Sequence, residues 1–229
     1  MGGAITACLM FSTAEYPYAS SWRRGALWPV LTVMILTLAA TRAGRKRKTA
    51  FGLEDSQRGR NAAQVAANLG AAALVVTLGP LLPLIGPANP MFITLLAYAA
   101  LAEAAADTVS SELGQVFGGQ PRLLTTLQRV DPGTDGGITL AGTATGIVAA
   151  AVISAVGIWT MTGSLASNWM GFGVILLGGV FGLFFDSLLG ATLERRGWLN
   201  NDAVNFLGTL SAAAFALALG KALVSFLKG

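Results

Sequence analysis

The stretch "DPGTDGGITLAGTATGIVAAAVISAVGIW" covers residues 131–159 and joins two very different kinds of sequence. Its first part, residues 131–146, contains five glycines and two aspartates. The second part, residues 147–159, is almost entirely apolar and is typical of a helix that crosses a bilayer. A flexible, charged segment therefore stands directly before a predicted membrane helix.

The composition of the whole chain indicates the same solvent. Hydrophobic residues make up 54% of the 229 residues and charged residues only 11%, whereas about a quarter of a soluble domain is charged. We predict an all-α fold, a polytopic transmembrane helical bundle of about six or seven helices that forms a single domain over residues 1–229. The predicted spans are a short piece at 3–12 and the stretches 25–41, 62–84, 91–113, 137–161, 169–190 and 203–227.

Two residue counts limit the chemistry. The single cysteine, Cys8, excludes an internal disulfide and a cysteine-rich metal site, and the sequence has no histidine. A histidine base, histidine metal ligands and haem ligation are thereby excluded. Any reaction must use carboxylates, amides, hydroxyls, basic side chains or a bound metal.

Basic residues predict the topology. The connection 42–60 contains seven lysines and arginines, and the connections 114–136 and 191–202 contain two arginines each. The connections 79–90 and 162–168, which alternate with them, contain no charge. The positive-inside rule places the basic set in the cytoplasm, although Arg23 and Arg24 fall on the other side. We expect an integral protein of the bacterial plasma membrane whose basic loop 42–60 also contacts anionic membrane lipids.

Four of the predicted spans carry polar stripes toward this cytoplasmic edge: Asn61, Gln64 and Asn68; Glu103, Asp107, Ser110, Ser111 and Glu112; Asp186; and Asp202, Asn205 and Thr209. Carboxylates within a span need partners, and the spans contain almost no basic residues. Hard oxygen ligands favour Mg²⁺. We predict metal ligation by Asp107, Glu112, Asp186 and Asp202, with catalytic roles for Asp107, Asp186 and Asp202. Helix packing or capping is the alternative for Asp107, Glu103 and Glu112.

The glycines before the apolar run suggest an anion site. Glycine lets a ligand approach the backbone closely, and amides at a helix N-terminus bind anions. The predicted cradle is Gly133, Thr134, Asp135, Gly136 and Gly137, followed by Gly142 and Thr143. Close helix packing is the alternative for Gly142 and the preferred interpretation for Gly146, Gly178 and Gly182. There is no Walker motif, so this is not a P-loop.

Five ordered blocks of sequence resemble one family. They are "GRNAAQVAANLG" (59–70), "ADTVSSELG" (106–114), "DPGTDGGITLAGTATG" (131–146), "GVFGLFFDSLLGATLE" (179–194) and "LNNDAVNFLGT" (199–209). They resemble the integral membrane family that contains the phytyl-phosphate kinases of tocopherol and phylloquinone synthesis. The pattern around residues 107–114 and 142–146 is also similar to that of the CTP-dependent membrane lipid kinases.

The resemblance implies roles for individual residues. Asp107 falls on the metal or nucleotide aspartate, Ser110, Ser111 and Gly114 on its small-residue tail, and Gly142 and Thr143 on the nucleotide loop. We add Asn68 and Asn205 to the nucleotide site because they lie on the polar stripes. The lysine that those kinases carry before their glycine pair is missing here. The cationic phosphate contacts are then expected from Lys48, Arg58, Arg60 or Arg129.

The resemblance implies CTP-dependent phosphorylation of a prenyl monophosphate to the diphosphate, with Mg²⁺ as cofactor. The expected partners are the nucleotide, a prenyl-phosphate lipid and membrane lipids, without nucleic acid. A CDP-lipid type of cytidylyltransferase would use the same substrates, and it would release pyrophosphate in place of CDP. A lipid or small-solute transporter would also explain carboxylates within the spans.

Overall fold

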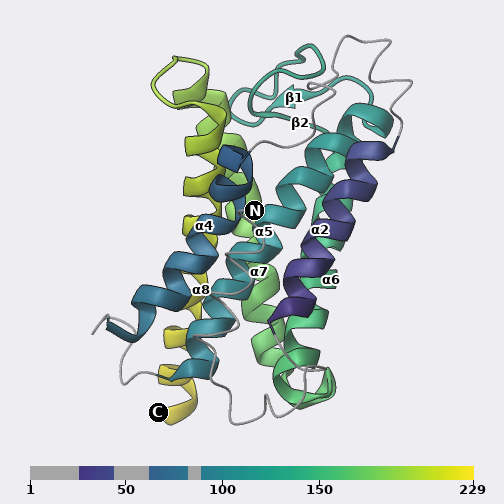
Figure 1. The fold of residues 1–229 in the computed structure, drawn as a ribbon. Coiled ribbons are helices and arrows are strands. Elements are labelled where there is room, and N and C mark those ends of the chain that lie inside the picture. Colours follow the sequence, from purple (N-terminus) through teal and green to yellow (C-terminus); the bar gives the residue numbers. More distant parts are fainter. Residues whose placement is uncertain (1–25, 44–61, 82–88) are drawn as a thin grey trace.

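A computed structural model describes residues 26–43, 62–81 and 89–229 (Figure 1). The predicted short piece at 3–12 lies outside the described residues. The helices are α2 (Leu27–Arg42), α4 (Ala62–Leu78), α5 (Pro90–Phe117), α6 (Leu140–Thr162), α7 (Trp169–Leu189) and α8 (Asn201–Lys228), with short turns η2 (Gly79–Leu81) and η4 (Ala166–Asn168) and a π-helical turn η5 (Gly190–Glu194). Two short strands, β1 (Arg122–Leu123) and β2 (Gly137–Ile138), pair antiparallel.

The predicted helical membrane bundle is confirmed. Within the described ranges, five helical segments are long and apolar enough to cross a membrane by length and composition, and α2 is a shorter apolar helix. The observed ends differ from the predicted ones mainly around α5 and α6. α5 continues to Phe117, and α6 begins at Leu140 because residues 137–138 pair with β1 instead of joining the helix.

Side-chain caps explain where α5, α6, α7 and α8 begin. Each N-cap side chain accepts hydrogen bonds from first-turn amides, which have no partner within the helix. At α6, Thr139 accepts from the amide of Gly142 at 3.0 Å. The other capping side chains are Asn89 for α5, Asn168 for α7 and Asn200 for α8. α6 ends at Thr162, and its C-cap Gly163 has a φ of 78°, which suits glycine.

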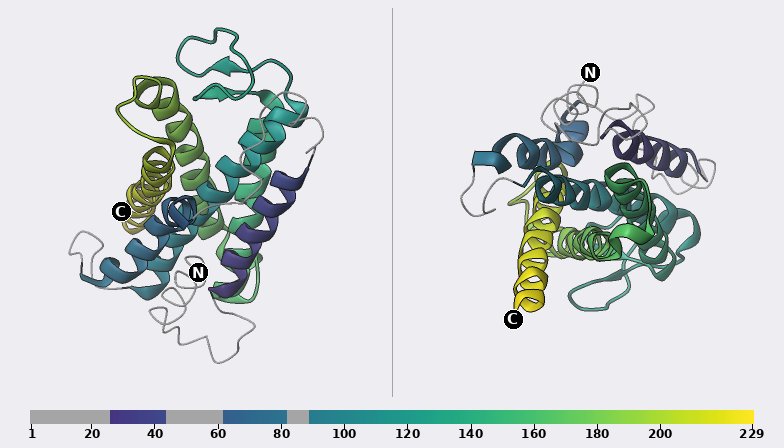
Figure 2. Two further views of the ribbon diagram at one scale, coloured as in Figure 1. Left: turned by 45° about the horizontal axis from the view of Figure 1, so that its top comes forward. Right: turned by 90° about the horizontal axis from the view of Figure 1, so that it is seen from below.

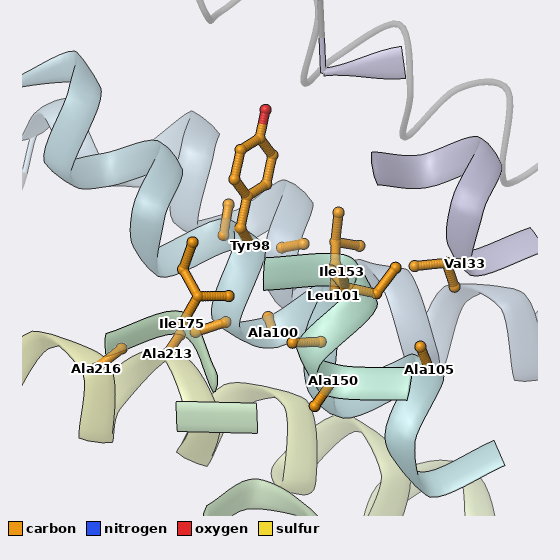
Figure 3. Close-up of a cluster of buried hydrophobic side chains, with 14 of the residues drawn as sticks. Val33, Tyr98, Ala100, Leu101, Ala105, Ala150, Ile153, Ile175, Ala213 and Ala216 are labelled. Carbon is orange, nitrogen blue, oxygen red and sulfur yellow. The ribbon is translucent and has the colours of Figure 1, made fainter. Parts of the chain in front are cut away.

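Helix α5 forms the centre of the bundle. Figure 2 shows it between α2 and α4 on one side and α6, α7 and α8 on the other, and it contacts all five. Residues 93–106 are buried without interruption, and many of them are alanines. Figure 3 shows part of this core, where Tyr98 and Leu101 of α5 lie among side chains of the neighbouring helices. Short side chains allow the neighbouring helices to approach closely.

Glycines face this central helix where the backbones come closest. A Cβ added to Gly179 of α7 would lie 2.8 Å from the Cβ of Ala102 and 3.2 Å from its carbonyl carbon. The predicted packing glycines behave alike: a Cβ on Gly146 would lie 2.8 Å from the carbonyl oxygen of Ala106, and one on Gly178 would lie 3.0 Å from the Cβ of Ala99. These glycines therefore determine how closely α6 and α7 approach α5.

We expect Gly179→Ala to lower the thermal unfolding midpoint of the detergent-solubilised protein. The added methyl group overlaps Ala102, and such overpacking typically costs about 1–3 kcal/mol. Gly173→Ala on the same helix is the matched control, because no heavy atom lies within 4 Å of its added Cβ. Equal midpoints for the two variants would contradict the close α5–α7 contact.

Successive helices run in opposite directions, so their connections gather at two ends. The C-terminal ends of α2, α5 and α7 and the N-terminal ends of α6 and α8 lie at one end of the bundle, which also holds β1 and β2 and is uppermost in Figure 1. We call it the loop end. The connections between α5 and α6 and between α7 and α8 therefore share one side, as the charge pattern predicts.

This arrangement leads to a labelling prediction. With Cys8 replaced by serine, cysteines introduced at Gln120 and Gly197 should be accessible to an impermeant thiol reagent from the same side of the membrane. Ser56 should show that same sidedness, although it lies outside the described residues. Inverted vesicles distinguish the cytoplasmic side, which we expect, from the opposite one. Labelling of Gln120 and Gly197 from opposite sides would contradict the shared loop end.

Candidate functional site

Five acidic residues form a cluster that extends from the bundle interior to the loop end. We define the acidic cluster as Glu103 and Asp107 of α5, Asp186 of α7, Glu194 of η5 and Asp135 of the α5–α6 connection. The negative charges of Asp186 and Asp107 repel that of Glu103. The charges of Asp107 and Glu194 likewise repel that of Asp186. The charges of Asp135 and Asp107 repel that of Glu194. The fold thus brings together carboxylates that lie far apart in the sequence.

The inner part of the cluster is enclosed by protein. Glu103 is 1% exposed and Asp186 is 9% exposed. Their carboxylates converge on Gly208 of α8, where an added Cβ would lie 2.7 Å from Oε1 of Glu103 and 3.0 Å from Oδ2 of Asp186. Both oxygens of Glu103 and Oδ2 of Asp186 have no hydrogen-bond partner among the described residues. Buried carboxylates without a partner are costly, so this pair requires a cation or a proton.

The outer part of the cluster lies against the glycine segment. Residues 131–137 form two consecutive turns, in which the amide and hydroxyl of Thr134 donate to the carbonyl of Asp131 at 3.1 and 2.8 Å. The amide of Gly137 then donates to the carbonyl of Thr134 at 2.9 Å. Gly133 and Gly136 have φ of 86° and 71°, a region that favours glycine. The glycines at these two positions are explained by the turns themselves.

The second turn docks onto the π-helical end of α7. A Cβ on Gly136 would collide with the backbone of Ala191, and a Cβ on Gly190 would lie 2.8 Å from the amide nitrogen of Gly136. Single π-helical turns are frequent at functional sites. Here the contact places Asp135 where its charge acts on Glu194. The close contact between the backbones at Gly136 and Gly190 therefore keeps Asp135 near Glu194.

Some of the predicted phosphate-binding amides are already used. The amide of Gly142 donates to Thr139 Oγ1, and the amide of Thr143 donates to the carbonyl of Thr139 at 2.8 Å. Gly142 is also buried, with an added Cβ only 2.6 Å from the carbonyl oxygen of Ser110. In this conformation the pair begins α6 and packs against α5. The amides of Gly133, Asp135 and Gly136 make no hydrogen bond within the described residues and stay candidates for phosphate.

The remaining predicted carboxylates lie apart from the inner pair. Glu112 accepts a hydrogen bond from Thr41 Oγ1 of α2 at 3.0 Å, on the side of α5 away from Glu103. Asp202 lies in the first turn of α8, where a negative charge favours the helix dipole. Within residues 26–43, 62–81 and 89–229, no group of three or more carboxylates is arranged to hold a metal by itself. A bound Mg²⁺ would therefore need water or phosphate oxygens as well.

The predicted amides and hydroxyls fall on several helices. Asn68 is buried on α4 and donates to the carbonyl of Gln64 at 2.8 Å, and Ser111 is exposed on α5 and donates to the carbonyl of Thr108. Asn205 is half-buried on α8. Arg129 is exposed and pairs with Arg122 in a β-bridge at the loop end. Lys48, Arg58 and Arg60 lie outside the described residues.

Two members of the acidic cluster carried little or no weight in the sequence. The sequence does not predict a site role for Glu194, which ends the block "GVFGLFFDSLLGATLE" beside two arginines. For Glu103, helix packing is an alternative interpretation of the sequence. Its position one turn before Asp107 is the signal that places both carboxylates on one helix face. Neither the π-helical turn nor the rotation of α8 that brings Gly208 to Glu103 follows from a local pattern.

Helices of membrane length around a buried alanine-rich helix, with an acidic cluster toward one end, define a polytopic helical membrane protein with a polar site at its loop end. The chain belongs to the family described as integral membrane protein DUF92, which matches residues 1–213. Membership confirms the resemblance seen in the sequence blocks.

Relatives of the chain occur in archaea, cyanobacteria and plants. It is 34% identical to an uncharacterized membrane protein of Methanocaldococcus jannaschii over 79% of this chain and 70% of that one. It is 30% identical to an uncharacterized membrane protein of Synechocystis over 83% and 72% of the two chains. It is 28% identical to the chloroplast protein VTE6 of Arabidopsis thaliana over 77% of this chain and 53% of that one. No solved structure matches the chain.

Proposed function

We propose that the chain is a membrane kinase that uses CTP to phosphorylate a prenyl monophosphate at the loop end. The observation that carries this proposal is the convergence of three of the five sequence blocks there. One block contributes Asp107 from α5, and another contributes Asp186 from α7 and Glu194 from η5. The glycine segment contributes Asp135, whose charge lies close enough to interact with that of Glu194. These blocks are the ones that resemble the phytyl-phosphate kinase family. Close packing between the blocks accounts for part of this convergence, and the carboxylates that they bring together support a shared site.

The proposed reaction needs charge neutralisation more than a strong nucleophile. An oxygen of the lipid phosphate attacks the γ-phosphorus of CTP, the bond from that phosphorus to the β–γ bridging oxygen breaks, and CDP leaves. Positioning and electrostatic stabilisation dominate such transfers. Asp107 and Asp186 would hold Mg²⁺, which would bridge to the nucleotide phosphates. The amides of Gly133, Asp135 and Gly136, which make no hydrogen bond to the described part of the chain, would contact phosphate oxygens.

The location of the site suits an amphipathic acceptor. Each buried CH₂ of a prenyl tail contributes about 0.8 kcal/mol, so the tail favours the bilayer without a deep aqueous pocket. The monophosphate head group is charged and must stay at the membrane edge. A polar site at the loop end of a membrane bundle meets both requirements. The monophosphate should therefore be a better acceptor than the free alcohol.

The decisive test is incubation of the purified protein with Mg²⁺, radiolabelled CTP or ATP, and a panel of prenyl alcohols and monophosphates. We expect a prenyl diphosphate and CDP from CTP and a monophosphate. Release of pyrophosphate would indicate a cytidylyltransferase instead. Turnover of the free alcohol at the same rate, or no turnover with any nucleotide, would reject the proposed reaction and favour a transporter.

A further inference from the structure

The inner carboxylate of Glu103 has no role in the site proposed at the loop end, although it lies beside Asp186. Glu103 occupies the middle of α5, one turn deeper than Asp107, and is enclosed by α7 and α8. It is almost completely buried, and neither of its oxygens has a hydrogen-bond partner among the described residues. A chain that only bound a nucleotide at the loop end could place an apolar side chain here.

Two glycines on two different helices make room for this pair. A Cβ on Gly182 of α7 would lie 2.5 Å from Cγ of Glu103, so only glycine lets the glutamate side chain pass. A Cβ on Gly208 of α8 would lie between Oε1 of Glu103 and Oδ2 of Asp186, at 2.7 and 3.0 Å. Glycine at position 208 therefore lets the two carboxylates converge against the backbone of α8.

The charge balance favours a divalent cation. Glu103 and Asp186 contribute two negative charges, and Asp107 acts on both of them. One shared proton would leave a negative charge buried inside the bundle, whereas one divalent cation neutralises the pair. Mg²⁺ is commonly bound by one or two carboxylates while it keeps several waters. Two convergent carboxylates therefore suffice, in agreement with the absence of a three-carboxylate group among the described residues.

We propose that Glu103 and Asp186 bind one divalent cation where their carboxylates converge beside Gly208, and that this binding requires no nucleotide. The ion neutralises the interior of the bundle and connects α5 to α7. The site shares Asp186 with the proposed nucleotide site, on which this inference rests for that residue. Its second ligand, Glu103, lies one turn deeper in the bundle, and it does not include the glycine segment. It can be tested whether or not the chain proves to be a kinase.

The experiment titrates purified wild-type protein in detergent with Mn²⁺ alone and follows the unbound ion by electron paramagnetic resonance. Carboxylate sites for Mg²⁺ also accept Mn²⁺. We expect one bound ion per chain without nucleotide, and at least tenfold weaker binding in Glu103→Gln. Gly208→Ala should also weaken binding at least tenfold, because its methyl group would displace the two carboxylate oxygens while both carboxylates remain. Glu112→Gln, on the same helix but bonded to Thr41, should bind within twofold of wild type.

Several results would overturn the proposal. Wild-type protein that binds no Mn²⁺ without nucleotide would show that protons, and not a cation, neutralise the two carboxylates. Glu103→Gln that binds as tightly as wild type would place any ion elsewhere. If Glu103→Gln does not fold, Glu103→Asp keeps the charge but withdraws the carboxylate by one methylene, and unchanged affinity in that variant would be equally decisive against the site.

Discussion

Asp107→Asn should lower the turnover of the proposed kinase reaction by a factor of about 100 or more while the protein still folds, a loss typical of a removed electrostatic contact in a transition state. Asp107 acts on three other carboxylates of the acidic cluster, Glu103, Asp186 and Glu194. Asparagine keeps the volume of the side chain but removes the charge that would attract Mg²⁺. The measurement is the initial rate of prenyl diphosphate formation at saturating CTP.

Glu112→Gln is the matched control for this prediction. It makes the same charge change on the same helix, five residues further along, where the carboxylate accepts a hydrogen bond from Thr41. We expect its rate to stay within a few-fold of wild type. Equal losses in the two variants would show that net charge at the loop end matters, and that Asp107 has no special position.

Gly136→Ala should impair both stability and activity. The residue has a φ of 71°, where a side chain costs about 1–2 kcal/mol, and its new methyl group collides with the backbone of Ala191. The overlap adds about 1–3 kcal/mol unless the segment moves away. Displacement would separate Asp135 from Glu194, so we expect at least a tenfold lower rate together with a lower unfolding midpoint.

Gly197→Ala separates the two causes. Gly197 has the same φ of 71°, but no heavy atom lies within 4 Å of its added Cβ. This variant should show the cost of the backbone conformation alone, with a small change in the unfolding midpoint and a rate close to wild type. A similar rate loss in both variants would mean that docking onto the π-helical turn does not position the site.

The class of fold could be predicted because it depends on local composition. Long apolar stretches with few charges indicate membrane helices wherever they occur, and the charge of the connections predicted which of them share a side. The beginning of α6 could not be located as well. Residues 137–138, which were predicted to start this helix, instead form β2 and pair with β1. Neither segment has the alternating apolar pattern that would predict a strand.

The candidate site was predictable in its outer part and not in its inner part. Asp107, Asp186 and the glycine segment stood in recognisable blocks. The convergence of Glu103 on Gly208 depends on how α5, α7 and α8 are rotated against each other, which no single helix encodes. For the same reason Glu112 was grouped with Asp107, although the fold turns it toward α2.

The burial of α5 has a consequence for how the protein is made. A carboxylate at the centre of a helix costs about 2.5–3.5 kcal/mol on insertion, and α5 carries Glu103 near its middle and Asp107 one turn later. As an isolated segment leaving the translocon, α5 is therefore poorly suited to lipid. Its neighbours α6, α7 and α8, which surround those side chains in the finished bundle, emerge from the ribosome only afterwards. Stable residence of α5 in the bilayer would then await the synthesis of the C-terminal half, so that truncation after α5 should yield a chain that quality-control proteases remove.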